Sequence, residues 1–317
     1  MLLVLVLLLT VPVTAQAADA SQWLLETAAD GDIVTVTMVL KSGQGVTNGR
    51  AALTYSDSLT LTGVQAAEGF GAVSVNTTAT GTVALAWVGS DITADETVML
   101  TASFTGARNG GSFAAETIEG YASGKKVAIA AASAEILANP FTDIDGHWAE
   151  EEILTAYHAG LFKGVSATEF APDAEMNRAQ FVTVLYRMAG SPAVTTEPAF
   201  TDVPAGSFYA DAVVWAVEKG ITNGVSATQF APSKALSRQE MVTMFYRYAA
   251  ASGADVSGRA DLSGYADAAD VARWATESFA WAIDAGLVEG MPGGLLSPAT
   301  TAVRAQVAAI LCRWLAI

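Results

Sequence analysis

The sequence contains a single cysteine, Cys312, so no disulfide bond can form within one chain. Small exported domains often depend on disulfides, so this chain must be stabilised by packing alone. Hydrophobic residues occupy 52% of the 317 positions, which is enough for about two domains with cores of their own. Cys312 lies in an apolar run, and we expect it to pack as a small hydrophobic side chain rather than to act as a thiol.

Positive charge is scarce, because 16 Lys and Arg residues face 32 Asp and Glu residues, for a net charge of −16. Such an excess of carboxylates repels DNA, RNA and anionic membrane surfaces, so we expect no nucleic-acid partner. An anionic ligand would have to be bound by individual arginines against the overall field.

Histidine is also scarce, since only His147 and His158 occur. No Ser/His/Asp or Cys/His set can be assembled in the N-terminal part, and no metal-ligand spacing is present. We therefore expect no enzymatic activity, no cofactor and no metal. A hydrolase that uses a pair of carboxylates, such as Asp57, Asp91 or Asp95, is the enzymatic alternative.

Only one long hydrophobic run occurs, at residues 2–13, and it is short for a membrane span of about 20 residues. Ala15 and Ala17 follow it in the pattern of a cleavage site, which predicts a signal peptide over residues 1–18. The positive charge that usually precedes the apolar run is missing, because the first basic residue is Lys41. We expect a secreted protein without membrane association after cleavage.

Residues 19–130 predict a β-sandwich. Short β-branched runs with alternating polarity are separated by turn residues, which is typical of two packed antiparallel sheets. The expected strands are 33–40, 51–55, 59–64, 73–75, 82–88, 97–104 and 126–129. An Ala-rich segment, 131–140, follows and is predicted to be a linker.

The remainder of the chain is a threefold repeat, over residues 141–190, 200–250 and 265–317. An aromatic residue, a glycine and an arginine recur with the same two spacings of 12 and 18 residues. The three sets are Trp148, Gly160 and Arg178, then Phe208, Gly220 and Arg238, then Trp274, Gly286 and Arg304. A unit of two short helices cannot bury its apolar face alone, so the three are expected to pack with pseudo-threefold symmetry into an all-α domain.

The start of each second helix predicts how that helix is capped. Ser237 and Glu240, like Asn177 and Gln180, have the spacing of a capping box, in which each side chain bonds the backbone of the other residue. In the third repeat the cap position is Val303, which has no acceptor. An arginine beside the free backbone amides of a helix N-terminus is an expected anion site.

These motifs resemble the S-layer homology domain. The resemblance rests on 141–144, His147-Trp148-Ala149, Lys219-Gly220-Ile221, Phe170-Ala171-Pro172 and Asn177-Arg178-Ala179-Gln180-Phe181, and it recurs in register over 141–317. It implies a three-pronged helical domain that binds secondary cell wall polymer, often through pyruvylated amino sugars. The motif arginine of that family meets the carboxylate of the ligand in grooves between repeats.

The candidate ligand-binding residues follow from this resemblance and from side-chain chemistry. They are the arginines Arg178, Arg238 and Arg304, the aromatic platforms Trp148, Phe208 and Trp274, the loop aspartates Asp143, Asp202 and Asp267, and the third helical residues Gln180, Glu240 and Gln306. For each arginine the alternative is a solvated or internally paired side chain; for each aromatic residue it is a place in the core.

The N-terminal region resembles the cohesin domain more weakly, through residues 31–36, 49–55, 83–86 and 100–104. A jelly-roll sandwich is implied, with a dockerin-bearing protein or a polysaccharide as its partner, and no binding residue is assigned. The sequence as a whole predicts a multidomain α and β protein at the cell wall or S-layer surface. It would anchor itself non-covalently to an anionic, pyruvylated wall polymer; the alternatives are a structural S-layer subunit or a wall-tethered polysaccharide hydrolase.

Overall fold

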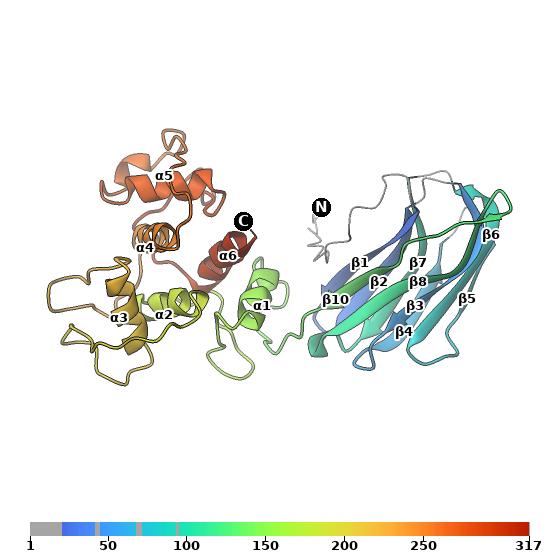
Figure 1. The fold of residues 1–317 in the computed structure, drawn as a ribbon, viewed down its shortest axis with the longest axis horizontal. Coiled ribbons are helices and arrows are strands. Elements are labelled where there is room, and N and C mark those ends of the chain that lie inside the picture. Colours follow the sequence, from blue (N-terminus) through green and yellow to red (C-terminus); the bar gives the residue numbers. More distant parts are fainter. Residues whose placement is uncertain (1–20, 42–44, 68–71, 93–94, 317) are drawn as a thin grey trace. The chain divides into compact units, whose positions relative to one another are not determined.

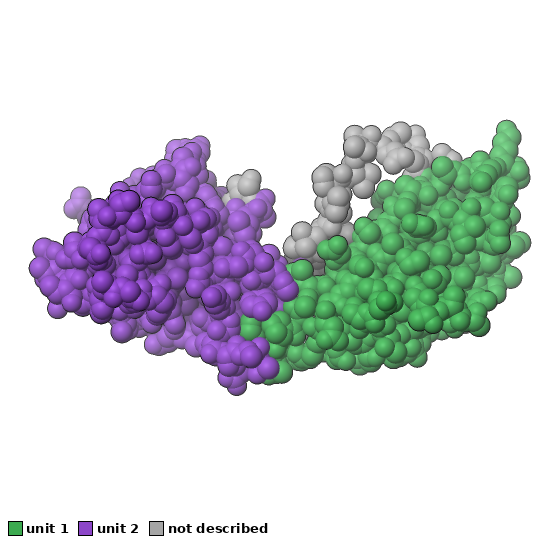
Figure 2. Space-filling view, turned by 60° about the horizontal axis from the view of Figure 1, so that its bottom comes forward, with its two compact units in different colours: residues 1–146 green, residues 147–317 purple. Residues whose placement is uncertain are grey.

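A computed structural model describes residues 21–41, 45–67, 72–92 and 95–316 (Figure 1). The chain divides into two compact units, Met1–Gly146 and His147–Ile317 (Figure 2). The predicted signal peptide lies outside the described residues. Within the described ranges, no helix combines the length and the apolar character that crossing a membrane requires.

The first unit is a sandwich of two antiparallel sheets (Figure 1). One sheet has the order β1 (Gln22–Asp30), β2 (Ile33–Lys41), β7 (Glu96–Thr105), β4 (Thr60–Ala66). The other has the order β10 (Ala132–Ile136), β8 (Gly111–Ala122), β3 (Val46–Tyr55), β6 (Thr82–Ile92), β5 (Ala72–Asn76), and β9 (Lys125–Lys126) pairs with β8. A single 3-10 turn, η1 (Ala107–Asn109), precedes β8.

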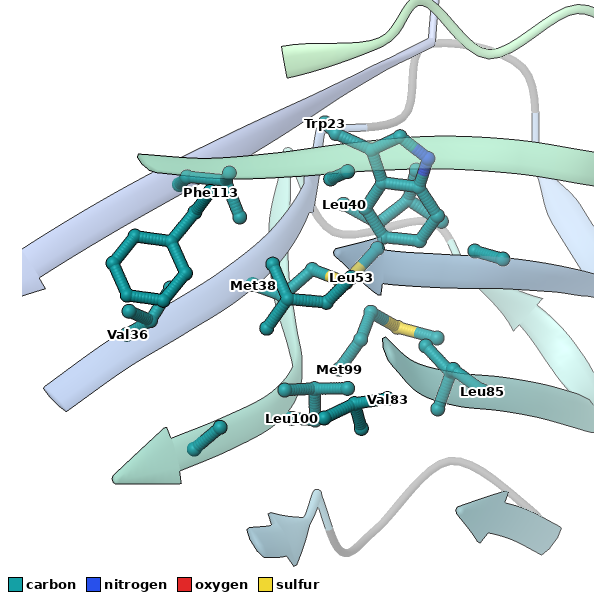
Figure 3. Close-up of a cluster of buried hydrophobic side chains, with 14 of the residues drawn as sticks. Trp23, Val36, Met38, Leu40, Leu53, Val83, Leu85, Met99, Leu100 and Phe113 are labelled. Carbon is teal, nitrogen blue, oxygen red and sulfur yellow. The ribbon is translucent and has the colours of Figure 1, made fainter. Parts of the chain in front are cut away.

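The core of the sandwich consists of the inward side chains of both sheets (Figure 3). The rings of Trp23 and Trp87 meet edge to face with their centroids 5.8 Å apart. The buried indole N–H of Trp23 has a hydrogen-bond partner there, because Nε1 donates to Thr117 Oγ1 at 2.7 Å. A Cβ on Gly49 would lie 2.6 Å from the Trp87 ring, so only glycine fits at that point of β3.

The expected strands within 33–104 all occur. The strand expected at 126–129 is wrong beyond Lys126, where β9 ends, and the predicted linker is the other correction. Part of the segment 131–140 is strand β10, which pairs with β8 over Ala132–Ile136. Its alanines and its serine have little intrinsic strand preference, so the sequence pattern gave no signal. Backbone hydrogen bonds to a formed neighbouring strand decide its conformation instead.

The second unit holds two α-helices for each repeat. They are α1 (Glu150–His158) and α2 (Arg178–Met188), α3 (Ala210–Glu218) and α4 (Arg238–Ala251), and α5 (Thr276–Asp284) and α6 (Arg304–Leu315), with a short 3-10 turn η2 (Ala268–Asp270). Gly160, Gly220 and Gly286 follow the first helices with φ of 72°, 68° and 68°, the left-handed conformation that the sequence predicted.

The centre of this unit is extended rather than helical. A closed ring of three backbone hydrogen bonds joins the segments before the second helices. The Met176 amide donates to the Ala302 carbonyl at 2.9 Å, Ala302 donates to Leu236 at 2.8 Å, and Leu236 donates to Met176 at 2.8 Å. Each repeat therefore donates to one neighbour and accepts from the other, which gives the pseudo-threefold arrangement.

Candidate functional site

The three motif arginines occupy equivalent places, at the first position of α2, α4 and α6. Each side chain crosses to the following repeat. Arg178 Nε donates to the Phe230 carbonyl at 3.0 Å, Arg238 Nε to Leu296 at 3.0 Å, and Arg304 Nε to Phe170 at 2.8 Å. All three are buried, with exposed fractions of 4%, 3% and 6%. The arginines thus join the repeats into a ring, and each defines a junction between two repeats.

The expectation of free amides beside these arginines is wrong. The backbone amides of Arg178, Arg238 and Arg304 donate to Lys234, Thr300 and Ala174 of the following repeat, at 3.1, 2.9 and 3.0 Å. The next amide of each helix donates to a proline carbonyl of the same loop. The loop of the neighbouring repeat thus uses the N–H groups that an anion would need.

The contacted loops have a strained backbone at equivalent positions. Ala171, Ala231 and Ser297 adopt positive φ of 58°, 59° and 49°, which is unusual for residues other than glycine. Each precedes the loop proline, at the point where the motif arginine of the preceding repeat is bound. Such a conformation persists only where surrounding contacts enforce it.

Two of the predicted aspartates provide those contacts. The Asp202 carboxylate accepts the amides of Phe230 and Ala231 at 2.8 and 2.7 Å, and Asp267 accepts those of Leu296 and Ser297 at 2.7 Å each. Burial by itself would raise the pKa of Asp202, but these amides and the charge of Arg178 outweigh it and lower the pKa. The structure therefore gives both aspartates a loop-holding role, and their contact with a ligand stays a prediction.

The remaining loop aspartate, Asp143, is exposed and belongs to the first unit, in the loop before α1. Its pairing with a ligand likewise stays a prediction.

The residues at the third position of α2, α4 and α6 accept hydrogen bonds from the backbone amides of the N-cap residues. Gln180 and Glu240 complete capping boxes with Asn177 and Ser237, as the sequence predicted. In the third repeat only half of the box forms, because Gln306 Oε1 accepts the Val303 amide at 3.3 Å and valine returns no bond. Ligand contact by these residues stays a prediction.

The three helix-opening aromatic residues are on the surface. Trp148, Phe208 and Trp274 are 60%, 70% and 53% exposed. The alternative of a place in the core is therefore wrong for all three, and each first helix begins two residues later. Residues one turn further along, such as Ile153, Val213 and Phe279, provide the buried face instead. The aromatic side chains are thus accessible from solvent, and their contact with a ligand stays a prediction.

His147 and Cys312 show no feature of a catalytic group in the structure. His147 Nδ1 accepts the Ala149 amide at 3.1 Å, and its Nε2 lies 3.5 Å from Asp173. Burial raises the pKa of the Cys312 thiol to about 12, so it stays protonated. Among the residues that the structure describes, no cluster of three His, Cys, Asp or Glu side chains is placed to hold a metal ion. The absence of enzymatic activity stays a prediction.

The six-stranded sheet of the sandwich carries two exposed apolar residues, Val88 on β6 and Ile118 on β8, which are 68% and 56% exposed. Arg50 and Glu119 form an ion pair of 2.7 Å between β3 and β8. The partner of this unit, a dockerin-bearing protein or a polysaccharide, stays a prediction.

The threefold ring of helix pairs, joined by arginines at equivalent junctions, defines a repeat protein built from three equivalent helical units. The model of the S-layer homology domain matches residues 140–182, 199–242 and 264–308. The chain therefore carries three S-layer homology repeats, in the positions that the sequence analysis assigned to them.

Curated relatives contain only a small region like this chain. The surface-layer 125 kDa protein of Lysinibacillus sphaericus is 34% identical over 152 residues, 48% of this chain and 12% of that protein. An amylopullulanase of Thermoanaerobacterium thermosulfurigenes is 28% identical over 173 residues, 54% of this chain and 9% of the enzyme. The repeats and the surface-layer relative support a location at the cell surface.

Solved structures similar to the chain include a non-cellulosomal cohesin of Archaeoglobus fulgidus. It is 14% identical, with a TM-score of 0.32 over 38% of this chain and 92% of the cohesin. A cohesin module of a Clostridium perfringens family 33 glycoside hydrolase is 10% identical, with a TM-score of 0.31, and 37% of this chain covers 96% of that module.

Proposed function

We propose that the three S-layer homology repeats attach this protein non-covalently to the bacterial cell wall by binding an anionic wall polysaccharide. One observation carries the proposal: Trp148, Phe208 and Trp274 stand at equivalent positions and expose more than half of their surface. Exposed aromatic side chains that recur with the symmetry of a domain indicate a contact surface rather than packing. The flat C–H face of a sugar ring packs against such rings.

The anionic character of the ligand is supported by the junction arginines. Each repeat boundary holds a buried guanidinium, so each contributes a positive charge in a chain whose net charge is −16. Arginine forms paired hydrogen bonds with carboxylates, which suits the carboxylate of a pyruvylated sugar. The anchoring role requires no catalytic group.

Retention on purified cell-wall sacculi tests the proposal. The full chain is mixed with native sacculi and with sacculi stripped of their polymers by hydrofluoric acid, and the pelleted fraction is measured. We expect retention by native sacculi only. Equal retention by the stripped sacculi would show that the peptidoglycan, and not the polymer, is bound.

The two alternatives give different results. A structural S-layer subunit assembles into sheets without any wall, which sedimentation of the pure protein detects. A wall-tethered hydrolase releases reducing sugars from wall polysaccharide. We expect neither, because the role rests on the surface of the repeats.

A further inference from the structure

The two sheets of the sandwich differ in the side chains that they turn away from the core. On β2, β7 and β4 threonine and serine predominate at these positions. Val36 (Figure 3) and Phe104 are fully buried, so the residues on either side of each point to the opposite face of the sheet. We call this surface the hydroxyl face, and it consists of Thr35, Thr37, Thr60, Thr62, Thr101, Ser103 and Thr105.

The register of the strands brings these hydroxyl groups side by side. Three cross-strand pairs form, each of two hydroxyl residues directly opposite one another: Thr35 with Ser103, Thr37 with Thr101, and Thr60 with Thr105. Neighbouring strands lie about 4.8 Å apart, and alternate residues of one strand lie about 6.8 Å apart. The hydroxyl face therefore presents a regular two-dimensional array of hydroxyl groups.

The hydroxyl groups of this face are available to a ligand. Thr62 Oγ1 donates to the Ser103 carbonyl at 2.9 Å. The other side-chain hydroxyls of the face make no hydrogen bond to another residue that the structure describes. A hydroxyl group both donates and accepts hydrogen bonds, so the array can pair with a ligand that carries donors and acceptors alike.

The hydroxyl face is uncharged, although the chain is strongly acidic. The charged residues of β2, β7 and β4 are Lys41 and Glu96, which lie at strand ends and pair with each other at 3.4 Å. The net charge of the whole chain is −16. A charged partner would gain no ion pair between these ends, so the electrostatics of the face favour an uncharged ligand.

The strand preference of threonine does not explain the array by itself. That preference holds on any pleated, half-buried surface and would distribute threonine over both sheets. In the middle of the other sheet, on β3 and β6, the outward positions include Ala52, Ala84 and Ala86. Arg50 and Glu119 form an ion pair on that sheet. The hydroxyl groups are thus concentrated on one face of the sandwich.

We propose that the hydroxyl face binds an uncharged polysaccharide chain laid across the strands. Sugar rings carry hydroxyl groups around their edges, and these match hydroxyl side chains as donors and acceptors. One pyranose ring spans roughly the distance between neighbouring strands, so a chain that crosses the sheet places about one sugar on each strand. The methyl groups of the threonines contact the C–H surface of the rings. This site goes beyond the proposed wall anchoring, which concerns an anionic polymer and the repeats.

Adsorption of the full chain to microcrystalline cellulose and to chitin, two uncharged polysaccharides, tests the site. Thr37→Val with Thr101→Val removes one cross-strand pair of hydroxyls, and valine keeps the branched shape and strand preference of threonine. The matched control is Thr54→Val with Thr82→Val, a cross-strand pair on the other sheet. We expect T37V/T101V to lower the affinity about tenfold and T54V/T82V to keep it, with neither thermal midpoint lowered.

Three results would overturn the proposal. The first is equal affinity of the two double variants, or no adsorption of the wild-type chain to either polysaccharide. The second is a parallel loss of T37V/T101V from native sacculi, because the wall contact is expected in the repeats and should not change. The third is dimerisation of the wild-type chain in sedimentation equilibrium that T37V/T101V abolishes, which would assign the face to a second copy of the chain.

Discussion

Arg304 in the last helix donates from Nε to the carbonyl of Phe170, 134 residues earlier in the chain, at 2.8 Å. This bond joins the third repeat back to the first and completes the cycle begun by Arg178 and Arg238. The ring of repeats is therefore closed by side chains as well as by the central backbone hydrogen bonds. At every junction the motif arginine donates a hydrogen bond that joins two repeats.

Loss of the closing arginine is expected to destabilise the repeat unit. Arg304→Ala leaves the carbonyls of Phe170 and Lys163 without this donor, so the free energy of unfolding should fall by about 2 kcal/mol or more. Chemical denaturation measures the change, and the exposed Arg273→Ala serves as control. Equal stabilities of the two variants would contradict the ring-closing role. Alanine at a junction arginine thus changes the stability of the fold as well as any contact of that arginine with a ligand.

The loop aspartates predict an acid-sensitive fold. The pKa of Asp202 is lower when folded, so its stabilising contribution is complete above the unfolded pKa, about 4, and is lost as the pH falls through the folded pKa. Asp202→Asn should lower stability at pH 7 and flatten its decline between pH 5 and 2. Denaturation across this range tests it. Glu197→Gln, at an exposed position, should leave the profile unchanged.

The defective cap of the third repeat offers a stabilising substitution. Val303→Thr keeps the side-chain volume and supplies the side-chain acceptor that the N-terminus of α6 lacks. The free energy of unfolding should therefore rise by about 0.5–1 kcal/mol. Ser237→Ala, which removes a formed cap, should lower it by about 1 kcal/mol. The two denaturation midpoints should move in opposite directions; a decrease for both would mean that Val303 is needed for packing.

In the sandwich, Gly49→Ala should be strongly destabilising. The added methyl would lie 2.6 Å from both the Trp87 ring and the Glu119 carbonyl, so the core or the pairing of β3 with β8 must shift, at a cost of about 1–3 kcal/mol. Gly63→Ala, in β4, has open space around its methyl group and is the matched control. Thermal unfolding of the two variants should separate them clearly, and equal midpoints would show that Trp87 moves freely.

We expect the exposed aromatic residues to contribute to binding of the cell wall and not to the stability of the fold. Replacing Trp148, Phe208 and Trp274 together by alanine should reduce retention on native sacculi at least tenfold, because each ring offers a sugar-stacking face. The unfolding midpoint should change little, since the rings are largely in solvent. Val88→Ala with Ile118→Ala removes comparably exposed apolar side chains from the sandwich and should leave retention intact. Loss of retention in this control would place the wall contact in the first unit.

Local signals in the sequence were sufficient for much of the fold. The alternating runs 33–40 and 97–104 lie in β2 and β7, and the capping boxes at Asn177 and Ser237 start α2 and α4. The strand β10 escaped prediction because its first four residues, two alanines, a serine and a glutamate, carry little strand preference of their own. The start of α1 also escaped prediction, since the helix begins at Glu150, two residues beyond Trp148.

The sequence by itself determined the repeat, its spacing, the caps and the turn glycines, because each depends on residues close together in the chain. Only the tertiary structure decided where the arginines point, since their partners lie more than 50 residues away in the following repeat. It also decided that the amides beside them are occupied and that Arg238 alone of the three has a buried nitrogen without a partner among the described residues. Burial and pairing depend on which repeat faces which, and no local pattern contains that information.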